Sequence, residues 1–271
     1  MLSILNSVSS LQAENALSNT TSALNKNLQQ LSTGLRINSG ADDAAGLSIA
    51  NGLQANIAAI SQSSQNASEG VGMLQTADGA LSQVTTLLNR AITLATEASN
   101  GGLSATQATA LNTEYASIQT EIDNIGTSTD FNGTAVFGSA GNVFESDGTT
   151  TSTISDAVAA LSSTGLGLTT KGTPLTTTAG AQAELALIDT AVSTVAADRG
   201  TIGATVNQLT ASQSVEGAAV TNLTSAVDSI QNADVGQVVA QMTQNSVLEQ
   251  TGMAALSQSN SIQQNVLKLL Q

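Results

Sequence analysis

The apolar residues of this chain recur in alternating steps of three and four over long stretches. The longest stripe covers roughly fifty residues, between Ala181 and Ile230. Its members are Ala181, Leu185, Ile188, Val192, Val195, Ile202, Val206, Leu209, Val220, Leu223, Val227 and Ile230, with Arg199, Gln213 and Glu216 as the interruptions. This spacing places one apolar stripe along an α-helix, so it predicts a helix about 75 Å long that pairs with other helices as a coiled coil.

A matching stripe in the first half predicts a second long helix. It runs through Leu53, Ile60, Ala67, Leu74, Ala77, Leu81, Val84, Leu88, Ala91, Ala95 and Ala98. The run stops at 100–102 (Asn-Gly-Gly), and Ser104 and Gln107 then have the spacing of a capping box, which starts a new helix. The same spacing returns at Ala108, Leu111, Tyr115, Ile118, Ile122 and Ile125. We therefore expect an antiparallel helical hairpin.

The two terminal segments carry apolar stripes that polar residues interrupt. The stripe near the N-terminus comprises Leu17, Leu24, Leu28, Leu31 and Leu35, and the one near the C-terminus comprises Val235, Val239, Met242, Met253, Leu256, Leu267 and Leu270. Helices with Asn, Gln and Ser inside the stripe have little core of their own, so we expect them to order only when packed against something. Apart from Val235, these positions are the candidate residues for assembly between subunits.

The segment 126–180 has a different texture, rich in Thr, Ser and Gly, and contains every Phe and the single Pro. We predict strands at Thr134–Phe137, Asn142–Phe144 and Leu166–Thr170, and a helical turn at Ser155–Leu161. This segment would form a small cap joining the two long arms. The predicted fold is mainly α: a long antiparallel helical coiled-coil rod with a small β-hairpin-containing cap and both termini at the same end.

Composition argues against an enzyme and against most ligands. Six basic residues stand against twenty acidic ones, a formal charge of -14, which is the wrong sign for binding nucleic acid. The chain has no Cys and no His, which excludes a cysteine nucleophile, the usual serine triad and the usual zinc sites. Asp42 and Asp43, the only adjacent acids, are better explained as first-turn residues of a helix. We expect no catalytic, cofactor-binding or metal-binding residues.

Neither a membrane span nor a cleaved leader is expected. No stretch approaches the roughly 18 uninterrupted apolar residues that a bilayer requires. The opening MLSILNSVSSLQAEN lacks a positively charged start, and its first basic residue comes only at Lys26. A cleaved secretory signal is therefore not predicted. Either the protein stays inside the cell or a different route exports it.

Three segments closely resemble bacterial flagellins. They are LSTGLRINSGADDAAGLSIANGLQANI at 31–57, TDFNGTAVF at 129–137 and QSNSIQQNVLKLLQ at 258–271. The resemblance covers about 1–137 and 180–271. It implies a subunit that self-assembles into the extracellular flagellar filament, the helical propeller of swimming bacteria. It also implies an inner coiled-coil domain at 1–42 plus 233–271, and an outer helical domain at 43–232 that includes the β-rich cap at about 126–180.

The resemblance also implies partners. Family members pass unfolded through the flagellar type III export channel, meet filament cap and junction proteins, and bind an export chaperone through the C-terminal segment, here Val239–Leu270. Positions matching those that bind animal Toll-like receptor 5 are Arg90, Leu94 and Glu114. Arg90 could instead pair with a carboxylate across a subunit contact. Flagellins are often decorated with O-linked sugars in the middle segment, and the corresponding candidates are Ser146, Thr149, Thr150, Thr151, Ser152 and Thr153.

Two other functional classes remain open at this stage. A hook-filament junction protein shares the terminal helices but occurs only at the filament base, whereas a filament subunit is abundant. The strong signature at 31–57 favours the filament subunit. The other class is a secreted coiled-coil protein unconnected with flagella. An enzyme hidden in the cap, such as a metalloprotease insert, would need histidines that this chain lacks.

Overall fold

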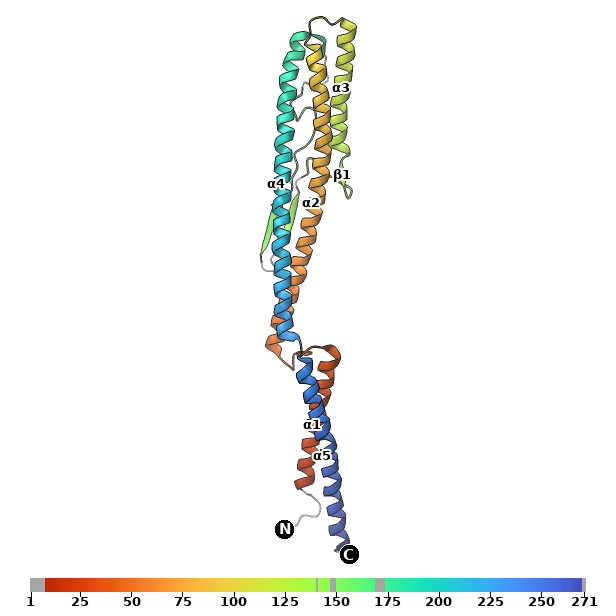
Figure 1. Cartoon of the computed structure of the whole chain (residues 1–271), viewed down its shortest axis with the longest axis vertical. Coiled ribbons are helices and arrows are strands. Elements are labelled where there is room, and N and C mark those ends of the chain that lie inside the picture. Colours follow the sequence, from red (N-terminus) through yellow and green to blue (C-terminus); the bar gives the residue numbers. More distant parts are fainter. Residues whose placement is uncertain (1–7, 140, 147–149, 169–173, 270–271) are drawn as a thin grey trace. The chain divides into compact units, whose positions relative to one another are not determined.

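The computed structural model describes residues 8–139, 141–146, 150–168 and 174–269, which are mostly helical (Figure 1). The helices in these ranges are α1 (Val8–Thr33), α2 (Ala44–Ala98), α3 (Ala105–Ser128), α4 (Thr178–Gln231) and α5 (Val235–Leu269), with a short 3-10 helix η1 at Pro174–Thr176. Two antiparallel hairpins lie between α3 and η1. The first pairs β1 (Asp130–Phe131) with β2 (Thr134–Ala135), and the second pairs β3 (Asn142–Ser146) with β4 (Thr151–Ser155). The mainly helical fold with a small β-hairpin is confirmed.

The chain forms two compact units. Unit 1 contains the residues up to Ala55 and those from Asn222 onward, and unit 2 contains Asn56–Thr221. Both divisions fall inside helices, because α2 and α4 each contribute residues to both units. Unit 1 thus holds α1 and α5, and unit 2 holds α3, both hairpins and most of α2 and α4.

In unit 1, α1 and α5 run antiparallel to one another. The hydroxyls of Ser10 and Ser259 hydrogen bond at 2.7 Å, and Leu17 faces Gly252. The beginning of α1 therefore lies beside the later part of α5, so the described ends of the chain lie at the same end of this unit, as expected (Figure 1). The seam between the helices is thin and partly polar, since Asn27 is buried while Leu17 is only half-buried.

The loop after α1 is bonded to the turn between α4 and α5. The backbone N–H of Arg36 donates to the Gln231 carbonyl at 2.6 Å, and that of Ala233 donates to the Gly34 carbonyl at 2.9 Å. The Arg36 guanidinium adds a bond from Nη2 to the Ile230 carbonyl at 2.6 Å. These bonds hold the two connections side by side. They therefore fix where α1 ends relative to the start of α5.

Asp42 and Asp43 lie just before α2, and not in its first turn as predicted. Asp43 caps the helix, because its Oδ1 accepts from the Gly46 N–H at 2.8 Å. Asp42 organises the loop instead: it accepts from two loop N–H groups and pairs with Lys26 at 2.8 Å. The hydrogen bond from Lys26 is the main reason that the pKa of Asp42 falls to about 2. The two acids are structural, but only Asp43 caps the helix.

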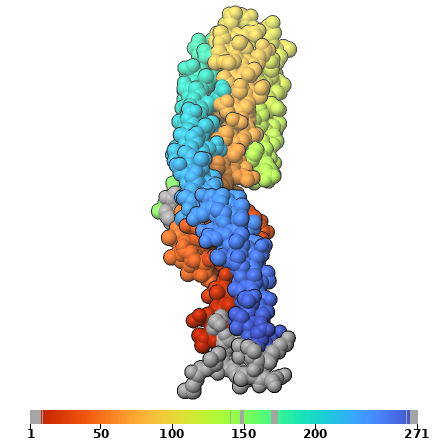
Figure 2. Space-filling model, turned by 60° about the horizontal axis from the view of Figure 1, so that its bottom comes forward, coloured from red at the N-terminus to blue at the C-terminus, as the bar shows by residue number. Residues whose placement is uncertain are grey.

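In unit 2, α2, α3 and α4 lie side by side (Figures 1 and 2). The members of the α2 stripe from Leu74 to Ala98 are all buried, and Tyr115, Ile118 and Ile122 of α3 complete the core with residues of α4. The buried apolar members of the α4 stripe within unit 2 are Ala181, Ile188, Val195, Ile202 and Leu209. The capping box at the start of α3 is confirmed, with Ser104 and Gln107 bonded reciprocally. The spacing thus predicted the long helices and their buried stripes, and the structure adds that three of them pack together.

The strands of the middle segment differ in part from the predictions. The strand at Asn142–Phe144 is confirmed within β3, and the one at Thr134–Phe137 shrinks to β2. The strand β4 was not predicted, because Ile154 is its only apolar residue. The prediction at Leu166–Thr170 is wrong for 166–168, because 166–167 lie in a turn and Leu168 belongs to no strand, while 169–170 lie outside the described residues.

The helical turn predicted at Ser155–Leu161 is also wrong. Its Ala- and Leu-containing composition suits a helix, but Ile154, Asp156 and Val158 are buried while the residues between them are exposed. This alternation with a period of two is that of an extended chain. Packing against the helices therefore overrides local propensity in this stretch.

We call the described residues between Thr129 and Thr177 the strap, because they lie along the sides of the helices and do not cap their ends. The N–H of Ser163 donates to Asp123 of α3 at 2.8 Å, and that of Leu175 donates to Asn112 of the same helix at 3.2 Å. The described residues of the strap thus contact α3 at Asp123 and, later in the chain, at Asn112. The predicted cap is replaced by this strap.

Gly126 is where the strap comes closest to α3. A Cβ at this position would lie 1.9 Å from the Leu161 carbonyl oxygen, and backbone cannot move aside as a flexible side chain can. We predict that Gly126→Ala lowers the free energy of unfolding by about 1–3 kcal/mol, as overpacking does. Urea unfolding followed by circular dichroism measures this change.

Gly79 of α2 provides the matched control, since a Cβ there meets no atom within 4 Å. Gly79→Ala should stabilise the protein by roughly 0.4–1 kcal/mol, because Ala has less freedom to lose on folding. Equal effects of the two substitutions would contradict the close approach of the strap to α3.

Candidate functional site

The described residues offer no catalytic or metal-binding constellation. No group of three or more His, Cys, Asp or Glu in the described ranges is arranged to hold a metal ion. The helices of the described chain also include none long and apolar enough to cross a membrane. The features of the described residues that bear on function are their exposed surfaces.

Exposed apolar side chains are concentrated on α1 and α5. Of the fourteen large hydrophobic residues that are exposed in the described chain, ten lie on these two helices. We call these ten the assembly surface: Val8, Leu11, Leu28, Leu31, Val235, Val239, Val247, Leu248, Met253 and Ile262. Each helix packs on a single neighbour within the unit, so the faces that point away from this neighbour stay uncovered. Exposed apolar side chains gathered on two helices in this way mark a candidate surface for contact with another molecule.

The predicted assembly residues divide between this surface and the seam. Leu28, Leu31, Val239 and Met253 are exposed, with exposed fractions of 47% for Leu28 and 50% for Met253. The half-buried members are Leu17, Leu24, Leu35, Met242 and Leu256. The side chain of Leu267 and the whole of Leu270 lie outside the described residues. The contact between α1 and α5 therefore covers only some of the residues in the two predicted stripes.

Stripe reasoning missed several members of the assembly surface. Val8, Leu11, Val247, Leu248 and Ile262 do not fall on the predicted terminal stripes, yet they are among the most exposed apolar residues of the chain. Their signal was present in the sequence, because apolar residues on more than one side of a helix indicate that more than one side is buried. A second neighbour outside this chain would complete the burial.

Arg90 and Glu114 pair directly. Arg90 of α2 donates from Nε to Glu114 Oε1 of α3 at 2.7 Å, and both side chains are exposed. This hydrogen bond raises the pKa of Arg90 and lowers that of Glu114. Leu94, the third predicted receptor residue, is fully buried in the unit 2 core. The structure thus brings two of the three together at the surface, and the carboxylate that Arg90 contacts belongs to its own chain.

The candidate sugar sites lie on the second hairpin. Thr151, Ser152 and Thr153 are exposed on β4, and Thr150 just before it is also exposed. Ser146 at the end of β3 is half-buried, and its hydroxyl donates to the Thr150 carbonyl at 3.2 Å. Thr149 lies outside the described residues. Exposed hydroxyls on one strand can accept a bulky group without disturbing the core.

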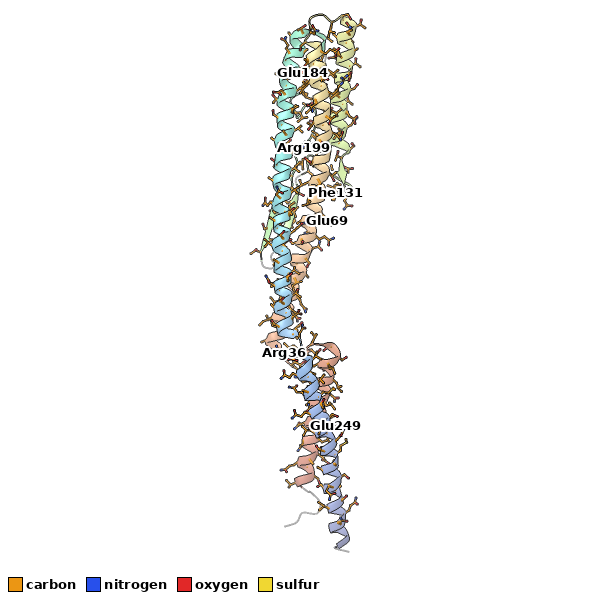
Figure 3. The ribbon with its side chains drawn as sticks, in the orientation of Figure 1. Arg36, Glu69, Phe131, Glu184, Arg199 and Glu249 are labelled. Atoms are coloured by element: carbon orange, nitrogen blue, oxygen red, sulfur yellow. The ribbon has the colours of Figure 1, made fainter. Side chains whose placement is uncertain are left out.

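The remaining charged contacts of unit 2 hold helices together. Arg199 of α4, labelled in Figure 3, makes a bidentate contact with Asp78 of α2 at 2.7 and 3.2 Å. The Tyr115 hydroxyl donates to Glu184 in the buried space between α3 and α4. Burial raises the pKa of Tyr115 far above its usual value, and the bond to Glu184 raises it further. These side chains position the helices and form no reactive site.

The N-terminal and C-terminal parts of the chain each match a known protein family. Residues 4–141 match the bacterial flagellin N-terminal helical region, and residues 185–270 match the bacterial flagellin C-terminal helical region. A flagellin of Bacillus subtilis (strain 168) is 31% identical over 98% of this chain and 99% of its own length. The crystal structure of Bacillus cereus flagellin aligns with a TM-score of 0.47 and 29% identity, over 56% of this chain and 88% of that one.

Other relatives are matched over a shorter region. A flagellin of Salmonella muenchen is 44% identical over 37% of this chain, and polar flagellin F of Vibrio parahaemolyticus is 37% identical over 39%. These matches span only 20% and 28% of the relatives' own lengths. The two family regions nevertheless take in most of this sequence, in the expected order. The chain therefore belongs to the bacterial flagellin family.

Proposed function

We propose that this chain is the structural subunit of a bacterial flagellar filament, exported from the cell and polymerised into the helical propeller for swimming. The observation that carries the proposal is the concentration of ten exposed large apolar residues on α1 and α5. All ten of these residues fall within the two flagellin family regions. Burying apolar surface between subunits contributes roughly 25 cal/mol per Å², and many contacts repeat along a polymer.

In this proposal the inner domain comprises 1–42 plus 233–271, and the outer domain comprises 43–232. The inner domain supplies the main contacts between subunits, since it contains the whole assembly surface. The outer domain has a core of its own. The unbroken burial of the α2 stripe in unit 2 supports this assignment. The two domains then have separate roles: one joins subunits, and the other keeps each subunit folded.

Before assembly, the same surface needs protection. We infer that an export chaperone covers Val239–Leu270, because exposed Val247, Leu248 and Met253 on α5 would otherwise promote premature association. At its two ends the filament contacts a cap protein and junction proteins.

A charge placed within the assembly surface should block polymerisation. Leu28 is 47% exposed, so Leu28→Glu leaves the fold of the monomer intact but introduces a carboxylate that subunit packing would bury. We expect seeded assembly from filament fragments to fall at least about tenfold, which corresponds to about 1.4 kcal/mol per contact. Sedimentation and negative-stain electron microscopy measure the polymer.

Gln29→Glu is the matched control, because it adds the same charge at the next, exposed position of α1. It should assemble nearly as well as the original chain. Normal filaments from Leu28→Glu would refute the role of this surface. Short end-caps from the unaltered chain would favour a junction protein, and persistent monomers a secreted coiled-coil protein unconnected with flagella.

We further propose that the monomer is a ligand of Toll-like receptor 5 through Arg90 and Glu114. The exposed guanidinium and carboxylate present a donor and an acceptor side by side. Buried Leu94 acts from beneath by packing α2 into the core, and does not itself contact the receptor. Arg90→Ala should lower receptor signalling about tenfold or more, as loss of a charged hydrogen bond does. Reporter cells exposed to monomer measure the signal, with Gln62→Ala, an exposed change elsewhere on α2, as the control.

We also propose that β4 carries O-linked sugars at Thr151, Ser152 or Thr153, because all three are exposed. The intact mass of protein from its native host should then exceed the bare 27.0 kDa. Changing the three residues to Ala together should return the mass to that of the bare chain. An unaltered protein of 27.0 kDa would disprove the modification.

A further inference from the structure

Two carboxylates are buried where the second hairpin packs on the helices. Glu145 of β3 has an exposed fraction of 9%, and Glu216 of α4 one of 8%. Glu145 points to the same side of β3 as Val143, which is also buried, while Phe144 between them is exposed. The alternation of the strand therefore forces this acid into the interior.

Serine hydroxyls bind one oxygen of each carboxylate. Ser212 Oγ donates to Glu145 Oε2 at 2.9 Å, and Ser63 Oγ donates to Glu216 Oε1 at 2.5 Å. Ser63 Oγ also accepts the N–H of Ser146 at 3.0 Å, so this one hydroxyl connects α2, β3 and α4. Because Ser212 and Glu216 are one helical turn apart, the two carboxyl groups are neighbours.

The other oxygen of each carboxylate has no donor. Glu145 Oε1 and Glu216 Oε2 are both buried and without a hydrogen-bond partner. Two neighbouring negative charges in such a place repel each other and lack solvation. A proton on one carboxyl group would remove one of the charges and supply an O–H donor.

No described cation neutralises the pair. Of the basic side chains that the structure describes, Lys26 pairs with Asp42, Arg90 with Glu114 and Arg199 with Asp78, while Arg36 donates to a backbone carbonyl. The side chains of Lys171 and Lys268, and Asp147 beside the hairpin, lie outside the described residues.

We propose that Glu145 and Glu216 form a proton-binding pair that takes up one proton as the β3–β4 hairpin docks on α2 and α4. With the proton bound, the hairpin is held against both helices. Loss of the proton at higher pH restores the repulsion between the two carboxylates, and the hairpin loosens. This pH-dependent latch goes beyond the filament function and does not depend on it.

The other acids near the hairpin are Glu69 and Asp156. Glu69 of α2 is exposed (Figure 3), whereas Asp156 directly after β4 is buried, and one of its oxygens also lacks a partner. Burial raises the pKa of Glu216, and the charge of Glu145 adds to this rise against the opposing bond from Ser63. Burial raises the pKa of Asp156 as well. All these groups are acidic, so none offsets the pair.

The direction of the pH effect follows from the raised pKa. Below the ordinary carboxyl pKa of about 4.3, Glu216 is protonated in both the docked and the open hairpin, and docking is at full strength. As pH rises toward the raised pKa of docked Glu216, the open state loses its proton first, and docking weakens by up to about tenfold per pH unit for one proton.

Hydrogen exchange of the full-length monomer between pH 5 and pH 8 tests the latch. Mass spectrometry would follow peptides that contain β3 and β4, corrected for the intrinsic pH dependence of exchange. We expect protection of the hairpin to fall at least tenfold over this range in the unaltered chain and less than threefold in Glu216→Gln, where one charge is absent. Glu69→Gln is the matched control, and it should behave as the unaltered chain does.

Three results would overturn the proposal. The first is an equal fall in protection for the unaltered chain and Glu216→Gln. The second is a fall that Asp156→Asn abolishes while Glu216→Gln leaves it in place, which would assign the proton to Asp156. The third is millimolar Ca²⁺ that protects the hairpin at pH 8 in the unaltered chain but not in Glu216→Gln, which would make the pair a metal site. Since only monomers are measured, the outcome is independent of whether the chain forms filaments.

Discussion

The burial of apolar stripes depends on how many neighbours each helix has inside its own chain. In unit 2, α2 packs against α3, α4 and the strap, so its stripe from Leu74 to Ala98 is covered without a break. In unit 1, α1 and α5 have mainly each other, and a single contact covers one side of a helix. Apolar residues elsewhere on these helices stay in water until another molecule covers them. The same type of helix is thus a core element in one unit and an interface in the other.

The near absence of aromatic residues allows the helices and the strap to approach one another closely. Ala and Gly bring the helices and the strap close together, and the larger side chains of the strap then fill positions over glycines. Phe131 packs over Gly72, and Val143 meets Gly70. Such contacts depend on missing Cβ atoms. Close approaches to these glycines, and to Gly126 beneath Leu161, therefore help to fix the strap along α2 and α3.

The helices could be predicted because their signal is local and long. A stripe that repeats over many turns, as in α2 and α4, leaves no competing structure, and the capping box at Ser104 fixed the start of α3. The strap could not be predicted in the same way. Ile154, Asp156 and Val158 alternate in burial because the strap packs against the helices, and those neighbours are invisible in the local sequence. The Arg90–Glu114 pair likewise depends on the register of α2 against α3, which no stripe specifies.

Scarce cations leave this acidic chain one main way to bury a carboxylate. Glu145, Glu184 and Glu216 are all bound by hydroxyls, from Ser212, Tyr115 and Ser63 respectively. A hydroxyl satisfies a lone pair but leaves the charge in place, so the electrostatic penalty of burial remains. A buried ion pair would remove it, but only six basic residues are present, and the exposed ones already hold loops and helices. Protonation is the remaining route to neutrality, and it makes the packing of unit 2 responsive to pH where carboxylates lie side by side.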